Sequence, residues 1–222
     1  MNSKYLISLL VAAFVAILSF TSCEQTESPV NQDPSQTSYQ DLYNLFQNAL
    51  ENTKSIEDLQ QRKKVLYTEM KVWDWNISTS TRTASDLSFE EQKAFLQNTL
   101  SPQMLQWVNR LQDSFVSNAN SISVEQIAND NTLKATEKQM LVAILAGGDY
   151  LKEMVQTAQT RAASDCYGKY QRDCERALQT YAVSGTVGSL AGGLLGLAGA
   201  TAVCALQLSW AEDDYNDCLA GK

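Results

Sequence analysis

Four cysteines lie in the last quarter of the chain, and thiols at these positions could form disulfides or bind a metal: Cys166, Cys174, Cys204 and Cys218. Thiolate metal sites prefer close pairs such as Cys-x2-Cys. Here 7 residues separate the first two cysteines and 13 separate the last two. An even number of cysteines favours disulfides in an exported chain, and the apolar N-terminal segment before Cys23 indicates export. We therefore expect two disulfides and no metal site.

Residue types that enzymes use for acid–base catalysis are scarce elsewhere in the chain. The chain has no His, which removes the commonest general base and metal ligand at neutral pH. A Ser or Asp enzyme would have to build its base from Lys or carboxylates, and no spacing suggests such a group. We expect no catalytic residue and no cofactor, which disfavours an enzyme.

Three other segments carry acidic, aromatic or glycine residues. The acidic cluster within Glu212–Asp217 lacks the alternating loop of a calcium site, so we interpret it as a solvated helix end. Trp73-Asp74-Trp75-Asn76 could stack on a sugar, but its first Trp also completes an apolar helix face. Gly147-Gly148-Asp149 is followed by no strand and no Lys-Ser/Thr pair. It therefore indicates a kink or a tight helix contact and not a phosphate loop.

The elements that position these residues are predicted to be helices. The chain has three prolines, none after Pro102, and few β-branched alternating runs. Apolar residues recur at helical spacing, and a Ser or Thr with a polar partner three residues on precedes many of these stretches. These start signals are Ser38, Ser55, Ser88, Ser123 and Thr136, together with Ser101-Pro102. They predict about six helices between residues 38 and 163, with a loop at Ile77–Ser88.

The segment from Ala177 to Ala211 is uncharged and holds six of the chain's ten glycines. Gly188, Gly192 and Gly196 repeat every four residues, as in a glycine zipper. This spacing stacks small residues on one helix face and lets another backbone approach closely. One unbroken helix over the segment would be about 52 Å long. A turn near Ser184–Gly193 would instead fold it into an antiparallel helical hairpin.

The hairpin determines which cysteines can pair. Along a straight helix Cys166 and Cys174 would lie about 12 Å apart, and Cys204 and Cys218 about 21 Å apart. A disulfide needs Cα atoms within roughly 4.4–6.8 Å. An antiparallel hairpin allows nested pairing, Cys166 with Cys218 and Cys174 with Cys204. The two pairs mismatch by about 9 Å along the helices, so we expect one outer cysteine to lie off the regular helix.

The uncharged segment could alternatively enter a membrane. The window Val187–Ala205 is long enough to cross a bilayer, but its glycines are expected to oppose insertion. Residues 166–222 also carry more acidic than basic side chains, unlike membrane-active helices. We favour an all-α fold in which a helical bundle is followed by a buried, disulfide-stapled hairpin, and insertion into a membrane or a partner stays open.

The N-terminal segment carries one basic residue, Lys4, then the uncharged apolar stretch Leu6–Leu18, and then Phe20-Thr21-Ser22-Cys23. It resembles the type II signal peptide of bacterial lipoproteins, with Phe20 where Leu is commoner. The resemblance implies cleavage before Cys23 and lipid on its sulfur and new amino group. Ordinary secretion and a retained anchor are the alternatives, although the apolar core is too short to span a bilayer. The acidic tether that follows is similar to those of Bacteroidota lipoproteins routed to the outer membrane or cell surface.

The predicted organisation is a signal peptide at 1–22, a polar tether at 23–37, a helical domain at 38–163 and the stapled hairpin at 164–222. Removal of the signal peptide takes away one of 17 basic side chains and none of the 25 acidic ones, so the net charge changes from −8 to −9. This balance disfavours nucleic acid and anionic lipid surfaces as partners.

The expected function is that of a non-catalytic envelope lipoprotein, held on the outer membrane by its N-terminal lipid, that contacts another protein at the membrane surface. Two alternatives remain. One is a membrane-active or toxin/immunity-type factor that uses the glycine-zipper hairpin. The other is a glycan-binding accessory lipoprotein.

Overall fold

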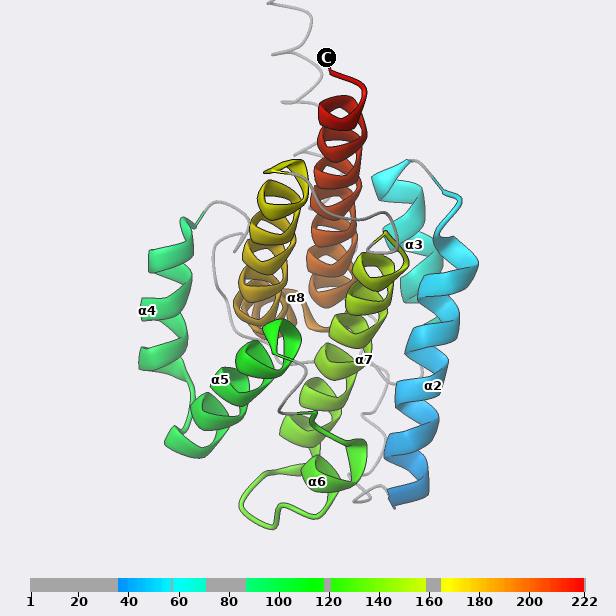
Figure 1. Cartoon of the computed structure of the whole chain (residues 1–222). Helices are drawn as coiled ribbons and strands as arrows, with labels where there is room; N and C mark the ends of the chain where they lie inside the picture. Colours follow the sequence, from blue (N-terminus) through cyan, green and yellow to red (C-terminus); the bar gives the residue numbers. More distant parts are fainter. Residues whose placement is uncertain (1–35, 57, 71–86, 118–120, 159–164, 222) are drawn as a thin grey trace, which may run out of the picture. The chain divides into compact units, whose positions relative to one another are not determined.

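The chain folds into α-helices, which confirms the predicted all-α class. A computed structural model describes residues 36–56, 58–70, 87–117, 121–158 and 165–221, and none of these residues lies in a strand. The predicted signal peptide, Trp73–Asn76 and most of the loop predicted at Ile77–Ser88 lie outside the described residues. The described helices are α2 (Gln36–Thr53), α3 (Leu59–Met70), α4 (Phe89–Thr99), α5 (Pro102–Val116), α6 (Val124–Ala128), α7 (Ala135–Ala158) and α8 (Asp165–Leu219) (Figure 1).

Three helices begin at the residues that the sequence predicts. Ser88 caps α4 and Ser123 caps α6, and each forms a reciprocal capping box with the side chain three residues on. Ser101 caps α5 by accepting the backbone N–H of Met104 at 3.2 Å, with Pro102 at the first helical position. These caps satisfy backbone N–H groups that have no partner inside the helix.

Other predicted helix starts are wrong by a few residues. Ser38 and Thr136 lie inside α2 and α7. At α3 the cap is Asp58 and not Ser55, because Asp58 Oδ1 accepts the backbone N–H of Gln61 at 2.6 Å. A carboxylate forms a stronger hydrogen bond than a hydroxyl and is also favoured by the positive end of the helix dipole. At α3 the acidic residue Asp58 therefore displaced the predicted start.

Helix α8 is a hairpin with its turn at two glycines. Gly192 (φ −140°, ψ 19°) and Gly193 (φ 55°, ψ −139°) leave helical geometry, so the chain reverses between two helical arms. A positive φ at Gly193 favours glycine because a Cβ would be strained there. Figure 1 shows the two arms of α8 side by side and running in opposite directions. The predicted antiparallel hairpin is therefore confirmed.

The arms touch backbone to backbone at Gly188 and Gly196. A Cβ added at Gly188 would lie 2.6 Å from the carbonyl oxygen of Gly196, closer than real Cβ atoms come. The absence of both side chains therefore allows this approach. Gly192 was predicted to pack in the same way, but a Cβ there would have nothing within 4 Å. That prediction is wrong because Gly192 belongs to the turn.

The other helices pack around this hairpin. Helix α8 contacts α3, α4, α5 and α7, and α7 also contacts α2, α5 and α6. Gly147 and Gly148 confirm the predicted tight contact, because the side chains of Tyr181 and Phe115 lie directly against the α7 backbone there. The predicted apolar faces supply much of the core: Tyr39, Leu42, Phe46, Leu50, Leu66, Met70, Met104, Val108, Leu111, Phe115, Met140, Leu141, Ile144 and Leu145 are buried.

Substitution of Gly196 by Ala should destabilise the protein strongly. The new Cβ would collide with the backbone of Gly188, which cannot move aside as a flexible side chain can. We expect a loss of about 3 kcal/mol in the free energy of unfolding, at the upper end of ordinary overpacking. Urea unfolding followed by circular dichroism measures it. Gly192→Ala is the matched control and should change stability by less than about 0.5 kcal/mol; equal effects of the two substitutions would contradict the close contact.

Candidate functional site

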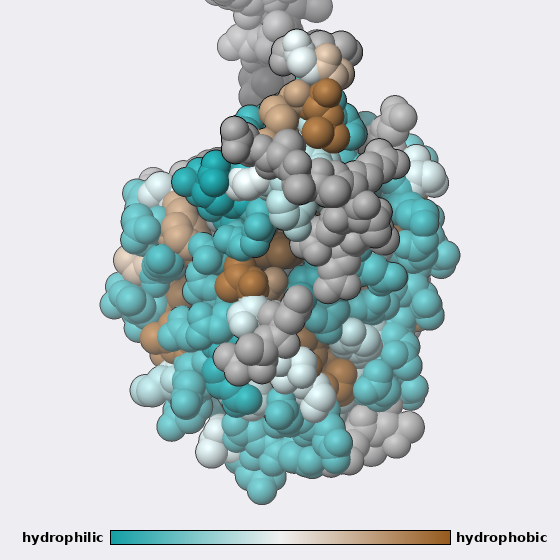
Figure 2. Space-filling view, viewed as in Figure 1, coloured by the Kyte–Doolittle hydropathy of each residue, from teal (hydrophilic) through white to brown (hydrophobic). Residues whose placement is uncertain are grey.

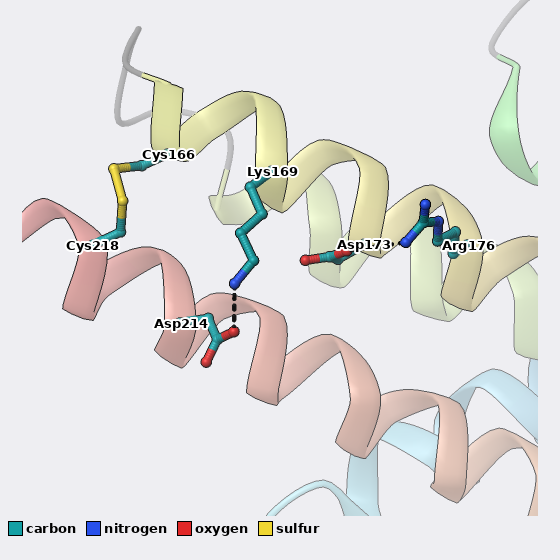
Figure 3. A network of polar contacts seen from close by, with 6 residues as sticks. All are labelled: Cys166, Lys169, Asp173, Arg176, Asp214 and Cys218. Carbon is teal, nitrogen blue, oxygen red and sulfur yellow. Dashed lines mark hydrogen bonds and ion pairs between the residues drawn. A yellow bond between two sulfur atoms is a disulfide. The ribbon is translucent and has the colours of Figure 1, made fainter.

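The end of the hairpin opposite the turn is closed by a disulfide. Cys166 and Cys218 are bonded with their Cα atoms 5.9 Å apart, which confirms the predicted outer pair. Figure 3 shows the bond between the two arms, next to the ion pair in which Lys169 Nζ lies 2.8 Å from Asp214 Oδ2. Tyr170 and Tyr215 pack between the arms nearby, with ring centroids 5.2 Å apart. The hairpin is thus held by glycines at one end and by a covalent bond at the other.

The predicted inner disulfide is not formed. Cys174 and Cys204 are both buried free thiols. The reason is register: in each of the pairs Gly188–Gly196 and Cys166–Cys218, the two residues are equally far from Gly192 in sequence. The position level with Cys204 is therefore 180, six residues from Cys174, which is about 9 Å along a helix. The expected mismatch of about 9 Å along the helices is present, but it separates Cys174 from Cys204. Both outer cysteines lie on α8, so the prediction that one of them lies off the regular helix is wrong.

The two free thiols are core side chains. Burial raises the pKa of the Cys174 thiol to about 11 and that of the Cys204 thiol to about 12. Cys204 Sγ donates a hydrogen bond to the carbonyl oxygen of Ala177, 3.4 Å away on the opposite arm. Since the thiolate is the reactive and metal-binding form, both sulfurs are poor nucleophiles at neutral pH. High pH should destabilise the fold. Both thiols lose their protons near pH 9 in the unfolded chain but only at about 11 and 12 in the folded chain. The free energy of unfolding therefore falls as the pH rises from about 9 through the folded pKa values.

A partly buried carboxyl group, Asp149, whose partners the sequence did not reveal, lies between α2 and α7. The phenol of Tyr43 donates a hydrogen bond to Asp149 Oδ2 at 2.8 Å, and Gln47 Nε2 donates to the Tyr43 oxygen at 3.1 Å and to the Ala146 carbonyl at 3.0 Å. Burial raises the pKa of Asp149. The group joins two helices far apart in sequence, so only the tertiary fold reveals it. We assign it a structural role.

The acidic residues at the end of α8 are exposed, as predicted for a solvated helix end. Glu212, Asp213 and Asp214 are all exposed, and Asp214 is held by Lys169. Within the described ranges no three His, Cys, Asp or Glu side chains are grouped so that they could hold a metal ion. The acidic residues instead mark where the uncharged part of the arm ends.

The second arm of α8 exposes large apolar side chains along one face. Leu195 is 47% exposed, Val203 43% and Trp210 62%. Their spacing of eight and seven residues places them on one helix face, with the buried Gly199 and the partly exposed Leu206 between them. We call these five residues the apolar stripe. The face drawn in Figure 2 is mainly hydrophilic with separate hydrophobic groups, which is usual for a protein surface. Exposed apolar side chains that share one helix face are typical of a contact site.

The opposite face of the same arm belongs to the core. Leu194, Leu197 and Leu208 are buried against the rest of the bundle. The arm is thus apolar on both sides, although Leu195, Val203 and Trp210 on its outer side stay exposed within the described part of the chain. The spacing of Gly199, Val203, Leu206 and Trp210, at alternating intervals of four and three residues, is the sequence signal for this second face. The glycine repeat in the same segment is the stronger pattern and obscures this spacing in the sequence.

Helix α8 is also the one candidate for crossing a membrane among the described residues, by its length and composition. Core helices of globular proteins pass the same test. More than half of its most apolar window is buried inside the protein, and the turn at Gly192 and Gly193 divides the helix into two arms. The described structure thus uses this segment as a core element.

No protein-family model, no curated protein and no solved structure matches this chain. The two remaining sequence candidates, Cys23 for lipid and Trp73–Asn76 for a sugar, lie outside the described residues. Both stay predictions. The described residues therefore offer the apolar stripe as the candidate functional site.

The cysteines provide a direct test of the hairpin register. Peptide mapping without reduction should recover Cys166 joined to Cys218, while Cys174 and Cys204 react with a thiol reagent only after unfolding. A link between Cys174 and Cys204 would contradict the register.

Replacement of Cys166 and Cys218 by Ser should lower the free energy of unfolding by about 4 kcal/mol, because the bond closes a loop with a sequence separation of 52. Denaturant unfolding measures it, with the untreated and the reduced native protein as controls.

Proposed function

We propose that the protein is a non-catalytic lipoprotein of the bacterial envelope, anchored by lipid on Cys23, that contacts another protein through the apolar stripe. The residues before Cys23 support the anchor. The chemistry of the side chains supports the non-catalytic role: the chain has no His, and the buried thiols have raised pKa values. The proposed location is the outer membrane.

The observation that carries this proposal is the exposure of the apolar stripe. Burial of an apolar side chain stabilises a folded chain by about 25 cal/mol per Å², yet Trp210 is 62% exposed. Trp is among the residues that most often dominate protein interfaces. The uncharged stretch extends across the whole stripe, from Leu195 to Trp210, and acidic residues begin directly after it. An exposed aromatic residue among apolar neighbours, with acidic residues beyond it, matches the usual anatomy of an interface.

A second candidate function is insertion of the hairpin into a membrane, which the apolar composition of α8 favours. The packing of the hairpin against α3, α4, α5 and α7 argues against it, because insertion would require the bundle to open. The glycan-binding alternative depends on Trp73–Asn76 and has no support from the described residues.

The substitution Cys23→Ser separates lipid anchoring from hairpin insertion. If lipid on Cys23 is the only anchor, the full-length variant should leave the membrane fraction upon extraction with alkaline carbonate, provided that its signal peptide is still removed. The unmodified protein should stay in the pellet. Immunoblots of the two fractions, with radiolabelled fatty acid to follow lipid attachment, provide the measurement. A variant that keeps its membrane association after signal removal would favour the inserted hairpin.

Photo-crosslinking in intact cells tests the contact surface. Benzoylphenylalanine in place of Trp210 should give a discrete crosslinked species, because an aromatic group at this position would lie within the proposed interface. The same residue at Gln179, which is exposed on the first arm and outside the stripe, is the matched control and should give none. The crosslinked species should disappear when Val203→Asp is added. Crosslinks of equal yield and pattern from both positions would show random neighbours and contradict the proposal.

A further inference from the structure

The apolar stripe carries a positive charge near the end closest to the turn. Gly199 has no side chain, and Lys63 of α3 lies over it: a Cβ added at Gly199 would be 3.1 Å from Lys63 Cε and 3.4 Å from Lys63 Nζ. The amine therefore lies on the second arm of α8, between the levels of Leu195 and Val203. Glycine at this position lets a lysine from another helix become part of the stripe.

The other end of the stripe carries negative charge. Asp213 is three residues after Trp210 and seven after Leu206, so it continues the same helix face. It is exposed. The neighbouring carboxylate of Asp214 is already held by Lys169 across the hairpin. The stripe thus has a basic group seven residues before Leu206, at Gly199, and an acidic group seven residues after it.

We propose that the partner of the apolar stripe is a second copy of this chain, packed antiparallel with a two-fold axis near Leu206. This inference rests on the proposed function. About such an axis, Lys63 over Gly199 lies level with Asp213 of the second copy, and the reverse contact repeats it. Val203 of each copy comes close to Trp210 of the other. A two-fold interface needs one patch that is complementary to itself. The pairs Lys63 with Asp213 and Val203 with Trp210 have this arrangement, whereas Leu195 lies level with residue 217, beyond the stripe.

The charges also determine the direction of packing. Parallel packing of two stripes would place Asp213 next to Asp213 and the acidic ends of both helices together, which is unfavourable. Antiparallel packing places each acidic end beside the basic group and the uncharged turn. The stripe alone is narrow compared with the roughly 800 Å² per partner of a standard interface. The pairing is therefore expected to be weak in solution and to increase where a shared membrane raises the effective concentration.

Cysteine crosslinking on membranes tests this pairing with the full-length, lipid-modified protein. Leu206→Cys lies next to the proposed axis, so oxidation with copper phenanthroline should give a disulfide-linked dimer at twice the monomer mass. Gln179→Cys on the first arm is the matched control and should give at least about tenfold less dimer, because that position is far from any axis through the stripe. The buried thiols of Cys174 and Cys204 do not interfere, since burial raises their pKa values.

Charge reversal tests the antiparallel direction. In the Leu206→Cys background, Lys63→Glu or Asp213→Lys should lower the dimer yield about fivefold, because two attractions across the axis become two repulsions. The combination of both should restore it. Lys64→Glu is the control, since Lys64 is exposed on α3 one residue from Lys63. A dimer that does not respond to the single reversals would overturn the antiparallel arrangement.

The two proposals fail in distinguishable ways. Absence of the Leu206→Cys dimer, together with capture of a different protein by the photo-crosslinker at position 210, would overturn the second copy and leave the proposed function standing. Absence of every stripe-dependent crosslink would overturn both. Circular dichroism of each variant shows that a lost crosslink does not come from a lost fold.

Discussion

The close contact between Gly188 and Gly196 is the constraint on which the rest of the structure depends. It fixes the register of the two arms of α8 next to the turn. Because the arms are regular helices, the same register places Cys166 level with Cys218, more than 20 residues from the turn. It also keeps Cys174 and Cys204 out of line with each other, so both remain thiols. One pair of missing side chains thus decides which sulfurs can bond.

The uncharged composition of α8 follows from how the arms are covered. The first arm is enclosed by its neighbours over much of its length: Leu178, Tyr181, Val187 and Leu190 are all buried. A charged side chain there would have to be desolvated without a partner, which is costly. Polar groups inside this region are satisfied locally, as when Thr186 donates to the Ala182 carbonyl oxygen at 2.7 Å. An apolar segment of this length therefore needs no membrane to explain it.

The sequence predicted those features that depend on local chemistry. The caps at Ser88, Ser101 and Ser123 depend on side chains within three residues, and the hairpin depends on glycine spacing within one segment. Features that depend on a distant element could not be predicted. The contact of Tyr43 with Asp149 joins residues 106 apart in sequence. The position of the turn decides which two cysteines lie opposite each other on the two arms. A turn three residues earlier in the chain would have placed Cys174 opposite Cys204.

In the proposed function, the two arms of the hairpin divide stability from recognition. The first arm and the inner face of the second arm form the core, whereas Leu195, Val203 and Trp210 take little part in it. Substitutions in the stripe can therefore alter contacts with other molecules while the fold is kept. Lys63 belongs to the stripe only because Gly199 leaves room for it. A larger residue at 199 would push the amine aside and keep the apolar groups. The position of this charge, on which the proposed pairing depends, is therefore set by a residue that has no side chain of its own.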